Sequence, residues 1–160
     1  MTVEASAPAD AIPVLRRAGG EDAAPIADLF WRVRQQCAPA IPPIAYPRDT
    51  VEPYVRDTML TSGEVWVAED PAGGLVGFLA LSEPDHLDHL YLDAPATGAG
   101  LGARFVALAR ERLPRGLQLW AFQSNVDAIR FYEREGFRQV QWTEGDNAEG
   151  APDVRMVWTP

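Results

Sequence analysis

A glycine-rich segment, ATGAGLGARF at residues 96–105, is the feature that most constrains the fold. It follows an apolar, strand-like run that ends at Leu92, and apolar residues at helical spacing continue after it. A strand that turns through glycines into a helix brings free backbone N–H groups and the positive end of the helix dipole to one point. Such a turn binds phosphate without any cationic side chain, although a purely structural turn would use the same residues. The segment therefore predicts an αβ architecture and leaves several phosphate-bearing ligands open.

The same residues satisfy a dinucleotide-binding pattern, G-x-G-x-x-A at 98–103. That pattern belongs to the first strand–helix turn of its fold, whereas here it follows a long series of other elements. The acidic residue expected about 20 positions later, which binds the ribose, is also missing from LQLWAF at 117–122. A nucleotide-dependent oxidoreductase is therefore disfavoured.

The charged residues exclude further classes. All 14 cationic side chains are Arg, so the lysines of phosphate-binding P-loops, of kinases and of Schiff-base enzymes are absent. The 23 acidic residues bring the net charge to −9, which disfavours nucleic acid as a partner and is compatible with a cationic amine substrate. The single Cys37 excludes an internal disulfide and a multi-cysteine metal site. No histidine lies near it in sequence, so we expect a partly buried residue rather than a nucleophile.

The length of 160 residues predicts one domain, which we place at 12–160 after a disordered tail at 1–11. No apolar run approaches the ~20 residues of a membrane span, and the N-terminus lacks the pattern of a signal peptide. We therefore expect a cytoplasmic protein without a membrane partner.

Hydrophobic periodicity predicts strands and helices in the order β-α-α-β-β-β-α-β-α-β-β. The expected strands are 13–18, 64–70, 75–83, 86–92, 117–122, 137–142 and 153–158, and the expected helices are 19–37, 48–61, 100–113 and 125–135. This order predicts an α/β (α+β) domain with a mixed sheet and helices on both faces.

A second motif decides between the remaining ligands. QSNVDAIRFYEREGF at 123–137 carries Asn, Ala, Phe-Tyr and Gly-Phe on a strand–helix–strand unit. Together with the glycine segment it resembles the GCN5-related N-acetyltransferase (GNAT) family, in a bacterial branch, over residues 64–142. The family's loop reads Gln/Arg-x-x-Gly-x-Gly/Ala, whereas Thr97 stands at the first position here. In this family the loop binds the coenzyme A pyrophosphate mainly through backbone N–H groups, so we expect the coenzyme to bind despite Thr97.

This resemblance implies a mostly antiparallel twisted sheet of about seven strands with about four helices, in which strands four and five splay apart. It also implies acetyl-CoA as the co-substrate, no metal, and transfer of the acetyl group to a primary amine by direct attack. The acceptor is a small molecule or a peptide and is not identified, and a homodimer remains open. The alternative is a non-catalytic acyl-CoA-binding sensor of the same fold.

By position in the family's motifs, the coenzyme contacts fall on the glycine segment, the strand before it and the start of the following helix. Leu92 offers backbone N–H groups to the pantetheine arm or the thioester carbonyl. Asn125 is either a helix N-cap, a contact to the coenzyme arm, or both. The coenzyme-binding residues are thus Leu92, Thr97, Gly98, Ala99, Gly100, Leu101, Gly102 and Asn125.

The resemblance makes Tyr132 the general acid for the departing thiolate, with core packing as the alternative reading. The resemblance also implies His86 or Asp88 as the general base, with Glu83 third; the alternative is that these are polar residues at an exposed strand start. Period-two alternation would place His86 and Asp88 on one strand face and His89 and Tyr91 on the other. A metal site from these divergent side chains is not expected.

The acceptor side is expected to be covered by the first two helices and the segment between them, with aromatic residues at Trp31, Tyr46 and Tyr54. The proline-broken segment APAIPPIAYP at 38–47 is a candidate specificity lid. The polar loop at 143–152 is expected to be a solvated hairpin connection, with a rim of the acceptor site or a dimer contact as the alternatives.

Overall fold

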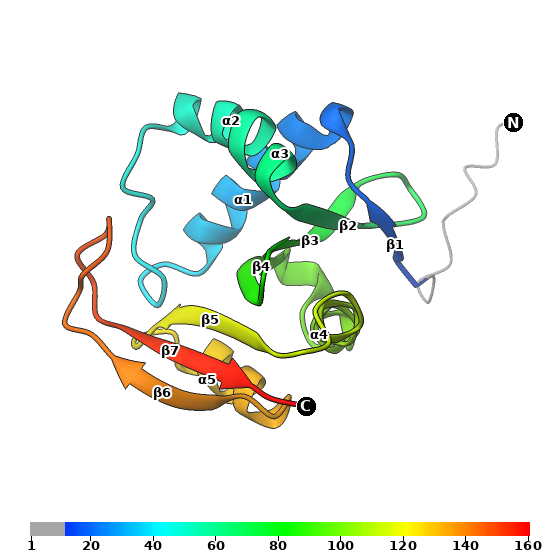
Figure 1. Cartoon of the computed structure of the whole chain (residues 1–160). Helices are drawn as coiled ribbons and strands as arrows, with labels where there is room; N and C mark the ends of the chain where they lie inside the picture. The colour runs from blue at the N-terminus through cyan, green and yellow to red at the C-terminus, as the bar shows by residue number, and fades with distance from the viewer. Residues whose placement is uncertain (1–11) are drawn as a thin grey trace, which may run out of the picture.

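Seven strands form one sheet in the order β1-β2-β3-β4-β5-β7-β6 (Figure 1). The computed structural model describes residues 12–160, and the expected disordered tail at 1–11 lies outside them. The strands are β1 (Val14–Arg17), β2 (Glu64–Glu69), β3 (Leu75–Ser82), β4 (His86–Leu92), β5 (Leu117–Phe122), β6 (Arg138–Trp142) and β7 (Asp153–Trp158). All neighbouring strands are antiparallel except β4 and β5. The predicted order of elements and the mixed, mostly antiparallel sheet are confirmed.

Helices cover both faces of this sheet. They are α1 (Ala23–Gln36), α2 (Val51–Tyr54), α3 (Leu60–Ser62), α4 (Leu101–Arg112) and α5 (Val126–Arg134), with short 3₁₀ turns η1 (Gly20–Asp22), η2 (Arg48–Thr50) and η4 (Ala94–Ala96). The expected helix at 48–61 is continuous but contains a π-helical segment, η3 (Val55–Met59), between α2 and α3. None of the described helices is long and apolar enough to cross a membrane.

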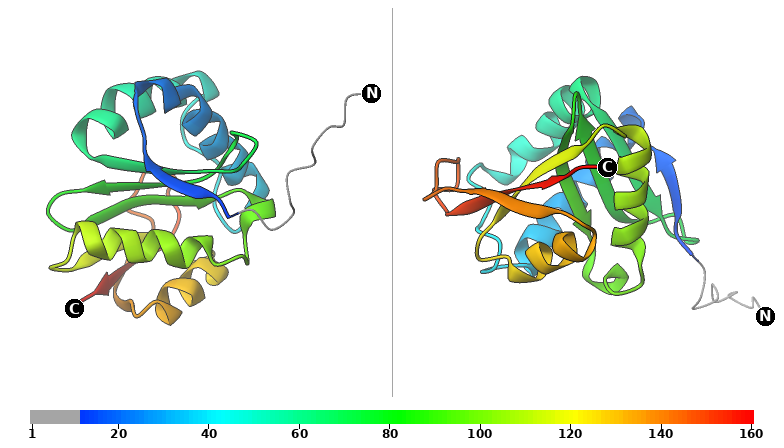
Figure 2. Two further views of the ribbon diagram at one scale, coloured as in Figure 1. Left: turned by 90° about the vertical axis from the view of Figure 1, so that its right-hand side faces the viewer. Right: turned by 60° about the horizontal axis from the view of Figure 1, so that its bottom comes forward.

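The two faces of the sheet have separate cores, which alternate along the strands as the side-chain period of two requires. On β3, Phe78 and Ala80 pack with α1 and α2, while Leu79 and Leu81 pack with α4 and α5. Figure 2 shows α4 and α5 on the side of the sheet away from α1 and α2. We call these the α1 face and the α4 face. Any ligand that touches both faces has to pass through the sheet.

The sheet opens between β4 and β5. These strands pair at one position only, His86 with Gln118, next to a 2.8 Å hydrogen bond from the Gln118 N–H to the Asp85 carbonyl. The Gln118 side chain reinforces that end by donating to the Asp85 carboxylate at 2.8 Å. Beyond this point the strands separate, and the predicted splay of strands four and five is confirmed.

One expectation about β4 is wrong. Leu87 packs in the same core as Leu90 and Leu92, on the α4 face, which strict alternation forbids. The cause is an irregularity in the β3–β4 ladder, where Ala80 pairs with His89 and Leu81 with Leu87, so that Asp88 has no partner. An extra residue of this kind resets the alternation. The α1 face therefore carries His89 and Tyr91 in continuation of His86, rather than on the face opposite to it.

Candidate active site

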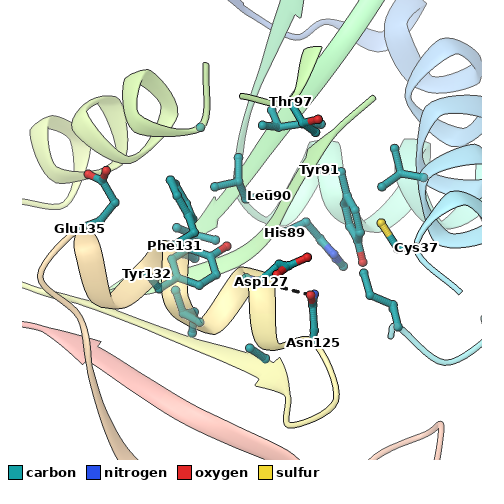
Figure 3. Close-up of a pocket in the computed structure, with 18 of the residues that line it drawn as sticks. Cys37, His89, Leu90, Tyr91, Thr97, Asn125, Asp127, Phe131, Tyr132 and Glu135 are labelled. Atoms are coloured by element: carbon teal, nitrogen blue, oxygen red, sulfur yellow. Dashed lines mark hydrogen bonds between the residues drawn. The ribbon is translucent and has the colours of Figure 1, made fainter. Parts of the chain in front are cut away.

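A cavity of about 560 Å³ occupies the opening between β4 and β5. Its walls come from both strands, from the C-terminal end of α1, from the glycine segment and from α5 (Figure 3). Residues of both faces take part: Leu92 and Tyr132 belong to the α4-face core, whereas His89 and Tyr91 lie on the α1 face. The cavity is thus a passage through the sheet with chemically different ends.

The three glycines at one end have different roles. Gly98 and Gly100 both have φ of +80°, in the left-handed region that favours glycine, and a Cβ on either would meet no atom within 4 Å. Gly100 is also the N-cap of α4, so the free N–H groups of this helix lie beside open space. A Cβ on Gly102 would lie 3.0 Å from the Phe131 ring, so this glycine lets α4 approach α5 closely.

Tyr132 is held at the cavity wall by α5. The Asn125 side chain caps this helix by accepting from the Ala128 N–H at 3.4 Å, so the predicted N-cap is confirmed. The Tyr132 ring packs against Phe131 and Phe137, with centroids at 5.1 and 5.5 Å. Burial, aided by the nearby Tyr91, raises the pKa of the Tyr132 phenol well above its usual value. The phenol therefore keeps its proton at neutral pH.

The sequence-predicted base candidates are separated by the structure. His86 lies at the closed end of the opening, with Nδ1 3.8 Å from the Asp85 carboxylate, and the cavity wall does not include it. Asp88 is exposed and lines the cavity. Of His86 and Asp88, only Asp88 therefore has access to a ligand in this cavity. Glu83, the third candidate, is exposed and outside the cavity wall.

His89, which is not among the predicted base candidates, lines the cavity on the α1 face. Its Nε2 lies 3.2 Å from the Tyr54 hydroxyl, and its ring packs edge-on against Phe30 with centroids 5.4 Å apart. Burial, followed by the positive charge of Arg34, lowers the pKa of His89 to about 4. The imidazole is therefore neutral at physiological pH. The sequence shows a histidine at this position, but the face of β4 on which it lies depends on the irregularity at Asp88, which the sequence pattern does not indicate.

Arg34 donates hydrogen bonds to β4, to the 38–47 segment and to the 143–152 loop. Its buried guanidinium donates to the Pro42 carbonyl at 2.7 Å, to the Glu149 carboxylate at 3.3 Å and to the Tyr91 hydroxyl at 3.4 Å. The Ser124 hydroxyl donates to the Ala40 carbonyl at 2.6 Å, which attaches the 38–47 segment to the other half of the sheet. Arg34 therefore links the 38–47 segment, whose Ile41 lines the cavity, to the 143–152 loop.

The remaining predicted residues of this side are less involved. Cys37 is half-buried in the cavity wall, and burial raises the pKa of its thiol. Trp31 stacks under the Arg48 guanidinium at 5.7 Å, and Tyr46 is exposed; neither lines the cavity. Among residues 12–160 no group of three or more His, Cys, Asp or Glu side chains is arranged to hold a metal ion.

Comparison with known proteins agrees with this geometry. The family model described as the acetyltransferase (GNAT) domain matches residues 61–139. The chain is 33% identical over 113 residues to the peptidyl-lysine N-acetyltransferase YiaC of Escherichia coli strain K12, a match that covers 71% of this chain and 75% of the relative.

Two solved structures share the fold. The histone acetyltransferase HPA2 and related acetyltransferase from Corynebacterium glutamicum superposes with a TM-score of 0.76 at 19% identity, covering 93% of this chain and 97% of that one. PaiA N-acetyltransferase from Thermoplasma acidophilum, solved in complex with coenzyme A, superposes with a TM-score of 0.72 at 16% identity, covering 92% and 99%. The sequence matches and the shared fold lead to one conclusion: the chain belongs to the GNAT family of N-acetyltransferases.

Proposed function

We propose that this protein transfers the acetyl group of acetyl-CoA to a primary amine by direct attack while both substrates are bound. The observation that carries the proposal is the cavity that crosses the sheet between β4 and β5, with a phosphate-type turn at one end and a protonated phenol in its wall. PaiA, which shares the fold, was solved with coenzyme A. The resemblance noted in the sequence motifs supports the same donor.

The donor end fits a pyrophosphate. The open space in front of Gly98 and Gly100 lets phosphate oxygens approach the backbone, and the N-terminus of α4 supplies N–H donors there. We assign this contact to Thr97, Gly98, Ala99, Gly100, Leu101 and Gly102. The pantetheine arm is then expected along β4, with the backbone of Leu92 as its partner, and Asn125 lies where the arm passes α5.

The chemistry needs a proton for the thiolate and a proton acceptor for the amine. The amine nitrogen forms a bond to the thioester carbon, and the carbon–sulfur bond then breaks. In the proposed mechanism Tyr132 gives its phenolic proton to the leaving sulfur, because it is the protonated acid in the cavity wall on the α4 face. Of the predicted bases, Asp88 is the one with access to the cavity.

For the acceptor we propose the side-chain amine of a peptidyl lysine as the first compound to test. YiaC is named for that activity and is 33% identical to this chain. The net charge of −9 is consistent with a cationic acceptor. Hydrophobic and aromatic residues on the α1-face side of the cavity, Val33, Ile41 and Tyr91, suit the apolar stem of a lysine.

The test is thermal unfolding with and without acetyl-CoA, followed by release of free thiol with lysine peptides. At 100 times the dissociation constant, mass action adds about 2.7 kcal/mol of stability. For a domain of this size we expect the melting temperature to rise by about 5–10 °C. NAD should give no shift. No shift and no calorimetric heat with millimolar acetyl-CoA would contradict the proposal, and binding without thiol release from any amine would favour the sensor alternative.

A further inference from the structure

We propose that His89 and Tyr54 form a proton relay that removes the proton from the acceptor amine. The inference rests on the proposed function, because it assigns the base of that reaction. In this proposal the role of the general base is shared by two side chains from different elements, His89 on β4 and Tyr54 on α2. The geometry that leads to it is the position of His89 in the cavity and its contact with Tyr54.

The position of His89 matches the side from which the amine approaches. The glycine segment and Tyr132 occupy the α4-face part of the cavity, so the remaining space for an acceptor is bounded by His89, Tyr91 and the end of α1. His86 is outside this space, at the closed end of the strand opening. Of the two histidines in the chain, His89 is therefore the one that can meet an acceptor nitrogen.

The contacts of His89 fix which atoms act. Nε2 faces the Tyr54 hydroxyl at 3.2 Å, and the ring is held between Phe30 and Tyr91, with centroids at 5.4 and 5.9 Å. Among residues 12–160 the one side-chain hydrogen bond of His89 uses Nε2, which leaves Nδ1 without a partner there. With the proton on Nε2, donated to the Tyr54 oxygen, the lone pair of Nδ1 is free to accept a proton from the amine.

The proton then moves without leaving a charge on the imidazole. Nδ1 takes the amine proton, Nε2 gives its own proton to the Tyr54 oxygen, and the Tyr54 hydroxyl proton passes to solvent. Tyr54 suits the outer position because 42% of its surface is exposed. Burial, followed by the negative charge of the accessible Asp88 carboxylate, raises the pKa of Tyr54, so this hydroxyl holds a proton between transfers.

A relay explains why an imidazole with a low pKa is useful here. The groups that face His89 are Tyr54 from α2, Tyr91 from β4 and the cationic Arg34 from α1. None of them stabilises an imidazolium, and Arg34 opposes it. A histidine that had to keep the proton would be a weak base in this position, whereas one that passes the proton on avoids the unfavourable charge.

The test compares His89→Gln and Tyr54→Phe with the wild type, using Trp142→Phe as the control for an exposed aromatic residue outside the cavity. Acetyl-CoA affinity is measured first by calorimetry. Binding in the wild type tests the proposed function separately, and equal affinity in the variants shows that the donor site is intact. Rates with a lysine peptide are then recorded from pH 6 to pH 9.

We expect His89→Gln to lower kcat/KM by about 100-fold at pH 7, and Tyr54→Phe by about tenfold. At pH 9 the loss in His89→Gln should be at least tenfold smaller than at pH 7, and the loss in Tyr54→Phe severalfold smaller. The reason is that a lysine amine with a pKa near 10.4 is increasingly deprotonated as the pH rises, so the base is needed less. Trp142→Phe should match the wild type. Rate losses that are the same at every pH, or a Tyr54→Phe variant with the wild-type rate and pH profile, would overturn the relay. The Tyr54→Phe result decides the matter even if His89→Gln does not fold.

Discussion

The two ends of the cavity are built in opposite ways. The donor end comes from two continuous stretches, 97–102 and 125–132, and most of its proposed contacts are backbone N–H groups. The proposed acceptor end comes from side chains of α1, the 38–47 segment and β4, such as Val33, Ile41 and His89. A site made of backbone N–H groups suits a ligand group that is the same in every reaction, such as a pyrophosphate. A site made of distant side chains can change its acceptor without altering the donor end.

The largest expected effect separates chemistry from binding at the donor end. Tyr132→Phe keeps the ring that packs against Phe131 and Phe137 but removes the phenolic proton. We expect kcat to fall by about 10²–10³-fold, with acetyl-CoA affinity changed less than about threefold. Thiol release and calorimetry on the same preparation measure the two quantities. A variant with undiminished turnover across several amines would remove Tyr132 from the mechanism.

The next effect tests whether the donor end depends on backbone geometry. Gly100→Ala places a methyl group in the open space before α4 and strains a residue with φ of +80°. We expect the dissociation constant of acetyl-CoA to rise about tenfold, because the methyl group obstructs the approach of the phosphate to the backbone. The left-handed alanine separately costs about 1–2 kcal/mol of folding stability. The acceptor KM should not change.

Gly150→Ala is the matched control for that substitution. Gly150 has φ of +65° and open space around it, but it lies in the 143–152 loop, away from the donor end. It should lose comparable stability while keeping wild-type affinity for acetyl-CoA, as measured by thermal unfolding and calorimetry. Equal loss of affinity in both variants would show that strain alone, rather than the phosphate contact, explains the Gly100→Ala result.

The last effect concerns the acceptor end and appears in the free energy of unfolding rather than in activity. The pKa of His89 is lowered from 6.5 to about 4 in the folded protein. Below pH 6.5 the unfolded chain binds a proton that the folded protein does not take up until about pH 4, so stability falls as the pH drops through this window. The loss attributable to His89 is at most about 3 kcal/mol. Urea unfolding of the wild type and His89→Gln between pH 7 and pH 4.5 should show a shallower fall for the variant, and parallel curves would contradict the buried, neutral histidine.

The elements that form the proposed donor end were largely predictable from the sequence because their signals are local. The glycines of 98–102, the Asn125 cap and the alternating strands are each visible within a few residues. The acceptor end was not predictable in the same way. The irregularity that leaves Asp88 unpaired depends on how β3 and β4 are registered. The Arg34–Glu149 contact joins residues 115 positions apart, and no periodicity signals it.

A crystal structure of the protein with acetyl-CoA tests the central claim most directly, namely that the opening between β4 and β5 is the donor channel. We predict the pyrophosphate on the backbone of residues 98–102, the pantetheine arm along β4 near Leu92, and the sulfur beside the Tyr132 hydroxyl. The acetyl group should then face His89 across the sheet. Acetyl-CoA bound elsewhere, with the strand opening empty, would contradict the account.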